Sequence, residues 1–286
     1  MELPPIVDFD PSEDIVFPRS VTPRLASGPF MAEIRRHPVN SGKVVMWHLG
    51  NNGWILKDDQ GTLTAIDPYL TDFCASQRTG ERRPKSRILP VFIEPEDFDV
   101  DVVVITHSHC DHCDPWTLER LRCRSSASFL APWQAMKVIA ECGVPRENQH
   151  LMHPLQTAIV RGIEVTGAFA EPTDFSDLNH MGFVFRFHGD RVYYNSGDTA
   201  KTELSAHVRS MKPEWMSICI NGGYHNLSHW EAAEICALIQ PKIVLPAHYD
   251  TMPHNLQPPH MFRKSLFEKA RDVAYLRLEY FQAYEF

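Results

Sequence analysis

One short stretch constrains this chain more than any other: residues 105–114, which read Ile-Thr-His-Ser-His-Cys-Asp-His-Cys-Asp. It places three histidines and an aspartate within six positions: His107, His109, Asp111 and His112. The β-branched run 100–105 before it is typical of a buried strand, and residues 115–121 after it favour a helix. Imidazole and carboxylate side chains in this arrangement suit zinc, manganese or iron at a hydrolytic site. The strand and helix signals disfavour the alternative, a histidine-rich surface loop.

The geometry of a strand explains the spacing. Side chains alternate along a strand, so His107 and His109 are expected on the same side. The chain then turns, which lets Asp111 and His112 point at a second position a few ångströms away. The motif therefore predicts one or two metal ions.

Composition sets the class of protein. A chain of 286 residues with 43% hydrophobic and 22% charged residues can form one large α/β domain or two small ones, with a sizeable core. The net charge of -8 disfavours nucleic-acid binding, so we expect no nucleic-acid partner. An anionic small-molecule substrate remains compatible, because a metal supplies positive field locally.

The cysteines indicate a reducing environment. There are seven, scattered along the chain, which favours free thiols and a cytoplasmic location. Cys110 and Cys113 form a Cys-x-x-Cys, but no second pair completes a zinc ribbon, so we expect both to pack beside the metal motif. The N-terminus lacks signal-peptide character, and no apolar run reaches the roughly 20 residues of a membrane helix. We therefore expect no membrane association.

Periodicity predicts an extended arm, rich in proline and acidic residues, over residues 1–42, with one short helix at 30–36. The hydrolase domain is expected over 43–286. Strands are predicted at 44–48, 54–57, 62–66, 100–105, 128–131, 158–160, 163–169, 182–187, 191–194, 243–245 and 274–281. Helices are predicted at 115–122, 132–142, 230–239 and 259–272, the third with Ser228 and Glu231 as a capping box. This alternation indicates an α/β layer architecture.

Two later stretches extend the pattern: Tyr-Tyr-Asn-Ser-Gly-Asp198-Thr and Ile-Val-Leu-Pro-Ala-His248-Tyr-Asp. With the His/Asp motif, in this order, they resemble the metallo-β-lactamase superfamily. Within it the chain looks most like the L-ascorbate-6-phosphate lactonases, and the resemblance covers most of the chain from Met46 onward. It implies an αββα sandwich: two mixed sheets face to face, helices outside, and the metal at the edge between them.

The resemblance also implies roles for individual residues. The implied metal ligands are His107, His109, Asp111, His112, Asp198 and His248. Asp198 would bridge two ions or bind a single one, and Asp111 or Asp198 would orient the attacking water or take its proton. Asp67 would lie under the site and orient its loops, with a turn cap before Pro68 as the alternative.

The third motif departs from the usual pattern. Many superfamily members carry a histidine after the strand that corresponds to residues 165–169, where this chain reads Ala-Glu-Pro-Thr-Asp. The lactonase branch also lacks that histidine. Glu171, Asp174 or His180 could replace it, and the sequence leaves the choice open. A mixed His/carboxylate site would favour manganese or a single metal. The expected cofactor is thus one or two zinc or manganese ions, with iron less favoured.

The predicted function is metal-dependent hydrolysis. By resemblance, the substrate class is a lactone, such as a phosphorylated sugar-acid lactone. The alternatives are a phosphodiesterase or nuclease of this fold, an iron-dependent redox enzyme of this fold, and an inactive scaffold. His225 and Tyr249 are candidates for substrate contact. Arg82, Arg83 and Arg87 in the loop 71–95 could contact an anionic substrate, although a solvated surface loop is favoured for each of them. A homo-oligomer is left open.

Overall fold

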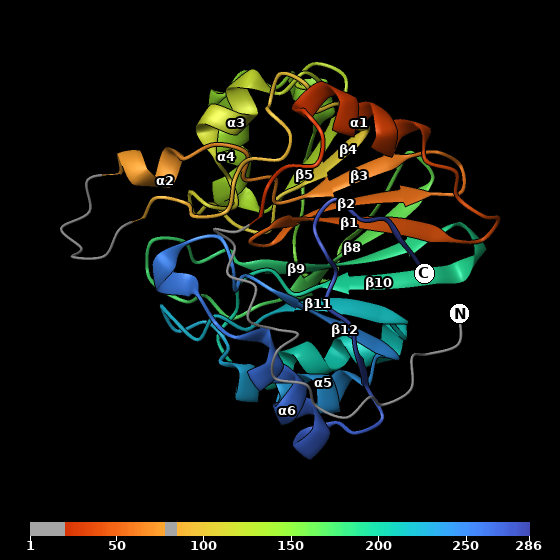
Figure 1. Cartoon of the computed structure of the whole chain (residues 1–286), viewed down its shortest axis with the longest axis vertical. Helices are drawn as coiled ribbons and strands as arrows, with labels where there is room; N and C mark the ends of the chain where they lie inside the picture. The colour runs from red at the N-terminus through yellow and green to blue at the C-terminus, as the bar shows by residue number, and fades with distance from the viewer. Residues whose placement is uncertain (1–20, 78–84) are drawn as a thin grey trace.

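The computed structural model describes residues 21–77 and 85–286 (Figure 1). The first 20 residues of the predicted arm, and Arg82 and Arg83, lie outside the described residues. Within the described part the chain folds as the predicted αββα sandwich, with two seven-stranded sheets face to face and helices on both outer faces.

The first sheet comes mainly from the N-terminal half. It has the order β14 (Tyr284–Glu285), β1 (Val44–Gly50), β2 (Gly53–Asp58), β3 (Leu63–Ile66), β4 (Val102–Val104), β5 (Ser128–Ala131) and β6 (Gln149–Leu151). The second has the order β13 (Ala274–Tyr275), β12 (Ile243–Ala247), β11 (Trp215–Cys219), β10 (Arg191–Asn195), β9 (Met181–Phe187), β8 (Ile163–Phe169) and β7 (Thr157–Val160).

The helices form the two outer layers. The α-helices are α1 (Ser27–Arg36), α2 (Phe73–Ser76), α3 (Pro115–Arg120), α4 (Trp133–Glu141), α5 (His229–Ile239) and α6 (Pro259–Lys269). The 3₁₀ helices are η2 (Arg146–Asn148), η3 (His188–Asp190), η4 (Glu203–Met211) and η5 (Pro253–Asn255). In Figure 1, α1, α3 and α4 lie over the first sheet, and α5 and α6 lie over the second. The described helices include none with the length and apolar character needed to span a membrane.

Three apolar clusters explain the layering. Strand β1 is buried on both faces, so apart from His48 its sequence is apolar rather than alternating with polar residues. Its Trp47 joins the cluster under α1, α3 and α4, while Met46 joins the cluster between the sheets. A third cluster, with Cys236 and Phe262, fills the space between the second sheet and α5 and α6.

The N-terminal helix belongs to the core. It begins at Ser27, earlier than predicted, and buries Phe30 and Ile34 in the first cluster. The ammonium group of Lys57 donates hydrogen bonds to the carbonyls of Arg35 and His37 at the helix end. Residues 27–36 are therefore packed against the sandwich, and the short helix predicted at 30–36 is confirmed.

The C-terminal strand was predicted wrongly. Residues 274–281 do not form one strand: β13 is two residues long and pairs with β12. The chain then crosses to the other sheet, where β14 pairs with β1. Leu278 and Phe286 in this crossing segment are buried in the inter-sheet cluster. The apolar surface that they bury favours the crossing over a longer β13. Strands β6 and β11 were also missed, whereas the capping box of Ser228 and Glu231 on α5 is confirmed.

Candidate metal centre

Strand ends deliver the candidate ligands to one edge of the sandwich. His107 follows β4, His180 precedes β9, Asp198 follows β10, and His248 follows β12. The amide of Met181 donates to the carbonyl of Thr106 at 3.0 Å, and this contact between the two sheets sets His180 beside His107. All four residues are at least 96% buried.

Local backbone geometry shapes these turns. Gly197 has a φ of +58°, and a Cβ there would lie 2.8 Å from the Met181 carbonyl and 2.9 Å from the Thr106 Cβ. Only glycine fits, as expected for a close approach before Asp198. His248 and Asp67 also have positive φ, 59° and 41°, a strained conformation that often marks functional sites.

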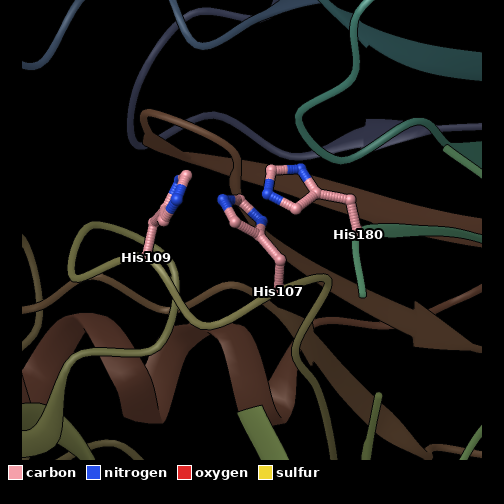
Figure 2. Close-up of side chains that lie close together, drawn as sticks. All are labelled: His107, His109 and His180. Carbon is pink, nitrogen blue, oxygen red and sulfur yellow. The ribbon is translucent and has the colours of Figure 1, made fainter. Parts of the chain in front are cut away.

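Three histidines form what we call the imidazole group: His107, His109 and His180. One ring nitrogen from each lies within 4.8 Å of the others, and Figure 2 shows the three rings gathered around a common point. The centroid of the His107 ring lies 4.5 Å from that of His109 and 4.0 Å from that of His180. The open choice among Glu171, Asp174 and His180 is thereby narrowed, because only His180 joins this group.

Hydrogen bonds fix which nitrogens of the imidazole group face inward. His180 donates from Nδ1 to the carbonyl of Asp198 at 3.0 Å. The Thr106 hydroxyl donates to Asp67, so at 3.0 Å it can only accept from His107 Nδ1. The Nε2 atoms of His107 and His180 are thus unprotonated, and both are buried without a hydrogen-bond partner among the described residues.

The third ring is held from outside. His109 Nε2 lies 2.9 Å from the Ser176 hydroxyl and 3.4 Å from an Asp174 carboxylate oxygen. Its Nδ1 is then the nitrogen left for the centre. Asp174 therefore lies beside the group through His109 rather than replacing the third histidine.

A second cluster, which we call the mixed group, consists of Asp111, His112 and His248. His248 Nε2 lies 3.0 Å from His112 Nε2 and 3.1 Å from Asp111 Oδ2. Asp198 lies between the two groups, since it also clusters with His107 and His112. Its Oδ1 is buried and has no hydrogen-bond partner in the described part of the chain.

These donors fit a metal centre. Buried polar atoms are normally hydrogen-bonded, so the inward-facing acceptor nitrogens of His107 and His180, which lack a donor, point to a cation as their partner. Three imidazoles on one side and imidazoles with carboxylates on the other match the donor sets of dinuclear hydrolytic sites. The preference for manganese or a single metal applied to a site in which a carboxylate takes the place of the third histidine. His180 supplies a third imidazole, so that reason no longer applies.

The two groups differ in charge. Burial, with the neighbouring His180 imidazole, holds the pKa of His107 well below its ordinary value. Burial would also lower the pKa of His112, but the carboxylates of Asp198 and Asp111 raise it well above its ordinary value. Burial opposes ionisation of Asp111, yet His112 and His248 keep its pKa below the usual range. In the polypeptide alone, His107 and His180 are neutral because their pKa values are lowered, and the mixed group is an ion-pair network.

Asp67 lies beneath both groups and is fully buried. Its Oδ2 accepts hydrogen bonds from His112 Nδ1 at 2.7 Å, the Thr106 hydroxyl at 2.6 Å and Asn52 at 2.7 Å. The bond to His112 fixes the tautomer, so that Nε2 points to the centre. These contacts are what the predicted supporting role requires.

Sequence reasoning missed two asparagines. Asn226 donates from Nδ2 to Asp198 Oδ2 at 2.6 Å, and Asn51 donates to the Asp111 carbonyl at 2.9 Å. Asn51 also lies 3.3 Å from Asp111 Oδ2, so each asparagine helps to orient one carboxylate of the centre. Both lie in glycine-containing turns whose composition alone indicates only a loop.

The residues predicted to contact a substrate lie in three different environments. His225 is exposed, beside Asn226, and belongs to neither group. Tyr249 is only 6% exposed, packed in the apolar cluster under α5 and α6, so the structure offers little surface there for a substrate. Arg87 was wrong as a substrate contact, because its guanidinium donates to four backbone carbonyls of the loops that it joins.

Comparison with known proteins agrees with this geometry. The family model described as the beta-lactamase superfamily domain matches residues 45–248, so the chain belongs to that superfamily. A UPF0173 metal-dependent hydrolase from Methanosarcina mazei is 29% identical over 234 residues, which is 79% of this chain and 91% of that protein.

Solved structures show the same fold. A metallo hydrolase from Ignicoccus hospitalis is 21% identical, with a TM-score of 0.67, over 85% of this chain and 98% of that one. An isothiocyanate hydrolase from Delia radicum gut bacteria is 18% identical, with a TM-score of 0.68, over the same shares.

Proposed function

We propose that this protein is a metal-dependent hydrolase that acts on a small-molecule substrate. The observation that carries the proposal is the pair of buried, inward-facing nitrogens on His107 and His180 that lack a donor, with the carboxylate of Asp198 clustered beside His107. Membership of the superfamily and the metal-dependent hydrolases among its relatives support the same class. When bound, the metal would lower the pKa of water towards about 7 and polarise the scissile carbonyl or phosphoryl oxygen.

The chain's own residues would hold the water and move its proton. Asp111 and Asp198 both have pKa values depressed by nearby imidazoles against the effect of burial, so both are ionised. Asn51 and Asn226 fix their orientations. Asp111 is the more accessible, with 14% of its side chain exposed against 5% for Asp198, which makes it the better placed to accept the proton.

The loop 171–179 would border the substrate. Ser176 and Asp174 contact His109, and Gln134 on α4 binds the Ser176 carbonyl and the Leu178 amide. Phe175 at the tip is 97% exposed. An exposed apolar residue beside a ligand-bearing loop supports contact with a substrate that has an apolar portion.

A lactone is the substrate class that we propose first. The motif resemblance to L-ascorbate-6-phosphate lactonases supports it, and an activated water beside a polarised carbonyl is the chemistry that lactone opening needs. The same donor set would serve phosphodiester hydrolysis, so both substrate classes belong in one screen.

The test combines metal content with a substrate screen. We expect wild-type protein purified without chelator to contain zinc or manganese, and folded His109→Ala to lose metal together with activity on lactones. Activity confined to phosphodiesters would replace the lactone. Iron near two equivalents would favour the redox alternative, and no metal in folded protein after zinc or manganese addition would sink the proposal.

A further inference from the structure

A third cluster of metal-binding side chains lies beside the mixed group. The thiols of Cys74 and Cys110 and the carboxylate of Asp111 have ligand atoms within 4.8 Å of one another. Neither thiol has a part in the hydrolytic chemistry described above.

The surroundings of the two thiols are soft and apolar. Cys74 is 1% exposed on α2, and it packs with Tyr69 and Met252, with Cys110 against them at partial exposure. Thiolate and thioether sulfur select soft cations, whereas the imidazole group has nitrogen donors only. This pocket therefore differs in chemistry from the neighbouring centre.

The carboxylate of Asp111 can serve both sides. Its contacts with His248, His112 and Asn51 all involve Oδ2, at 3.1, 3.8 and 3.3 Å. The Oδ1 atom is then the oxygen left for the sulfur side.

We propose that Cys74, Cys110 and Asp111 form a separate, sulfur-rich site for a soft divalent cation. Binding displaces one proton from each thiol to solvent, and the two thiolates and the carboxylate then surround the cation. Because Asp111 is shared, an ion here draws that carboxylate away from the mixed group. The site would therefore make metal loading of the centre sensitive to excess soft metal ions.

The test uses cadmium as the probe. Full-length protein is loaded with zinc, kept reduced with a phosphine and titrated with cadmium chloride. The readouts are thiolate-to-cadmium charge-transfer absorbance in the ultraviolet and bound cadmium after desalting. We expect the absorbance in wild type and its loss in Cys74→Ser and Cys110→Ser, each with about one cadmium ion fewer.

Cys142→Ser is the matched control. Cys142 is also buried, and its thiol lies 3.8 Å from the Pro115 carbonyl, a contact that a serine hydroxyl can keep. It should retain the absorbance and the cadmium count. Imidazole-bound cadmium gives no thiolate band, so exchange at the histidines does not mimic the result.

The proposal is overturned if wild type shows no thiolate band, or if the band persists in Cys110→Ser. Cys110 is partly exposed, so its substitution is the safer for folding, and the Cys110→Ser result decides even if Cys74→Ser does not fold. Neither readout depends on hydrolysis, so failure of this site and failure of the proposed function are distinguishable.

Discussion

The imidazole group and the mixed group lie side by side, yet the protein holds them differently. In the imidazole group, two inward-facing nitrogens are neutral and have no donor, and His109 is partnered by an exposed loop. In the mixed group, His112 and His248 share a close contact with two carboxylates, and Asp67 holds His112 from below.

The two groups differ in whether a cation must displace a proton in order to bind. A cation can enter the imidazole group without displacing a proton, because burial and mutual repulsion already keep His107 and His180 neutral. In the mixed group the carboxylates raise the pKa values of both His112 and His248 against the effect of burial, so a metal must compete with the protons on these imidazoles. The two ions should therefore bind with different pH dependence and different sensitivity to their supporting residues.

The largest expected effect comes from removing His180. His180→Ala takes one of three donors from the imidazole group, and we expect loss of one metal equivalent and a fall in activity beyond the roughly 10–100-fold typical of outer-shell changes. Elemental analysis and kinetics measure it. Glu171→Ala is the matched control, because this exposed residue joins no ligand group, and equal metal loss there would contradict our choice of His180.

Acid should separate the two ions. His112 has its pKa raised by carboxylates against burial, so below that pKa a metal must expel its proton. Affinity at the mixed group should fall about tenfold per pH unit as the pH decreases, whereas the first ion should respond less. Competition with a chromogenic chelator across a pH series measures both. If the affinities of the two ions changed with pH at the same slope, the proposed difference between the two groups would be contradicted.

Asp67→Asn should weaken the mixed group selectively. The side-chain amide keeps the shape but has only one acceptor oxygen, so it cannot accept both from His112 at the Oδ2 position and from the Thr106 backbone amide at the Oδ1 position, and His112 loses its fixed orientation. We expect a roughly 10–100-fold loss of affinity for one ion, by calorimetric titration. Asp101→Asn is the control, since Asp101 similarly accepts from the Leu63 amide away from the centre.

Ser176→Ala should have the smallest effect. It removes the hydroxyl beside His109 Nε2, but Asp174 still lies 3.4 Å from that nitrogen. At this exposed position we expect at most about a tenfold loss at the imidazole group, the low end for outer-shell partners. Ser210→Ala, on the exposed face of η4, should change nothing. A loss of metal affinity larger than that of Asp67→Asn would mean that the imidazole group depends more on its supporting residues than the mixed group does.

Local patterns in the sequence predicted an α/β layer architecture and the His/Asp motif, and the resemblance to the superfamily that these motifs carry implied the sandwich and the six candidate ligands. Alternating and continuous apolar runs predicted most strands to within one or two residues. The ligands before Asp198 come from one turn, where His112 and Cys113 donate back to the His109 carbonyl. Such spacing is visible without knowing the fold.

The third histidine was not visible, because its role depends on two distant segments. His180 reaches His107 through the bond between Met181 and Thr106, which joins the two sheets. Glu171 and Asp174 lie closer in sequence to the expected position and have suitable side chains, yet their backbone directs them elsewhere. The crossing of the C-terminal segment to β1 was hidden for the same reason.

The sequence by itself determined the donor types, their order along the chain and the strands that deliver them, since each follows from residue identity and short-range period. Only the tertiary structure decided that His180 completes the first group, that Asn51 and Asn226 orient the carboxylates, and that Arg87 is committed to backbone carbonyls. These outcomes depend on which strand ends meet across the sandwich. Packing of the two sheets sets that register, and local spacing does not encode it.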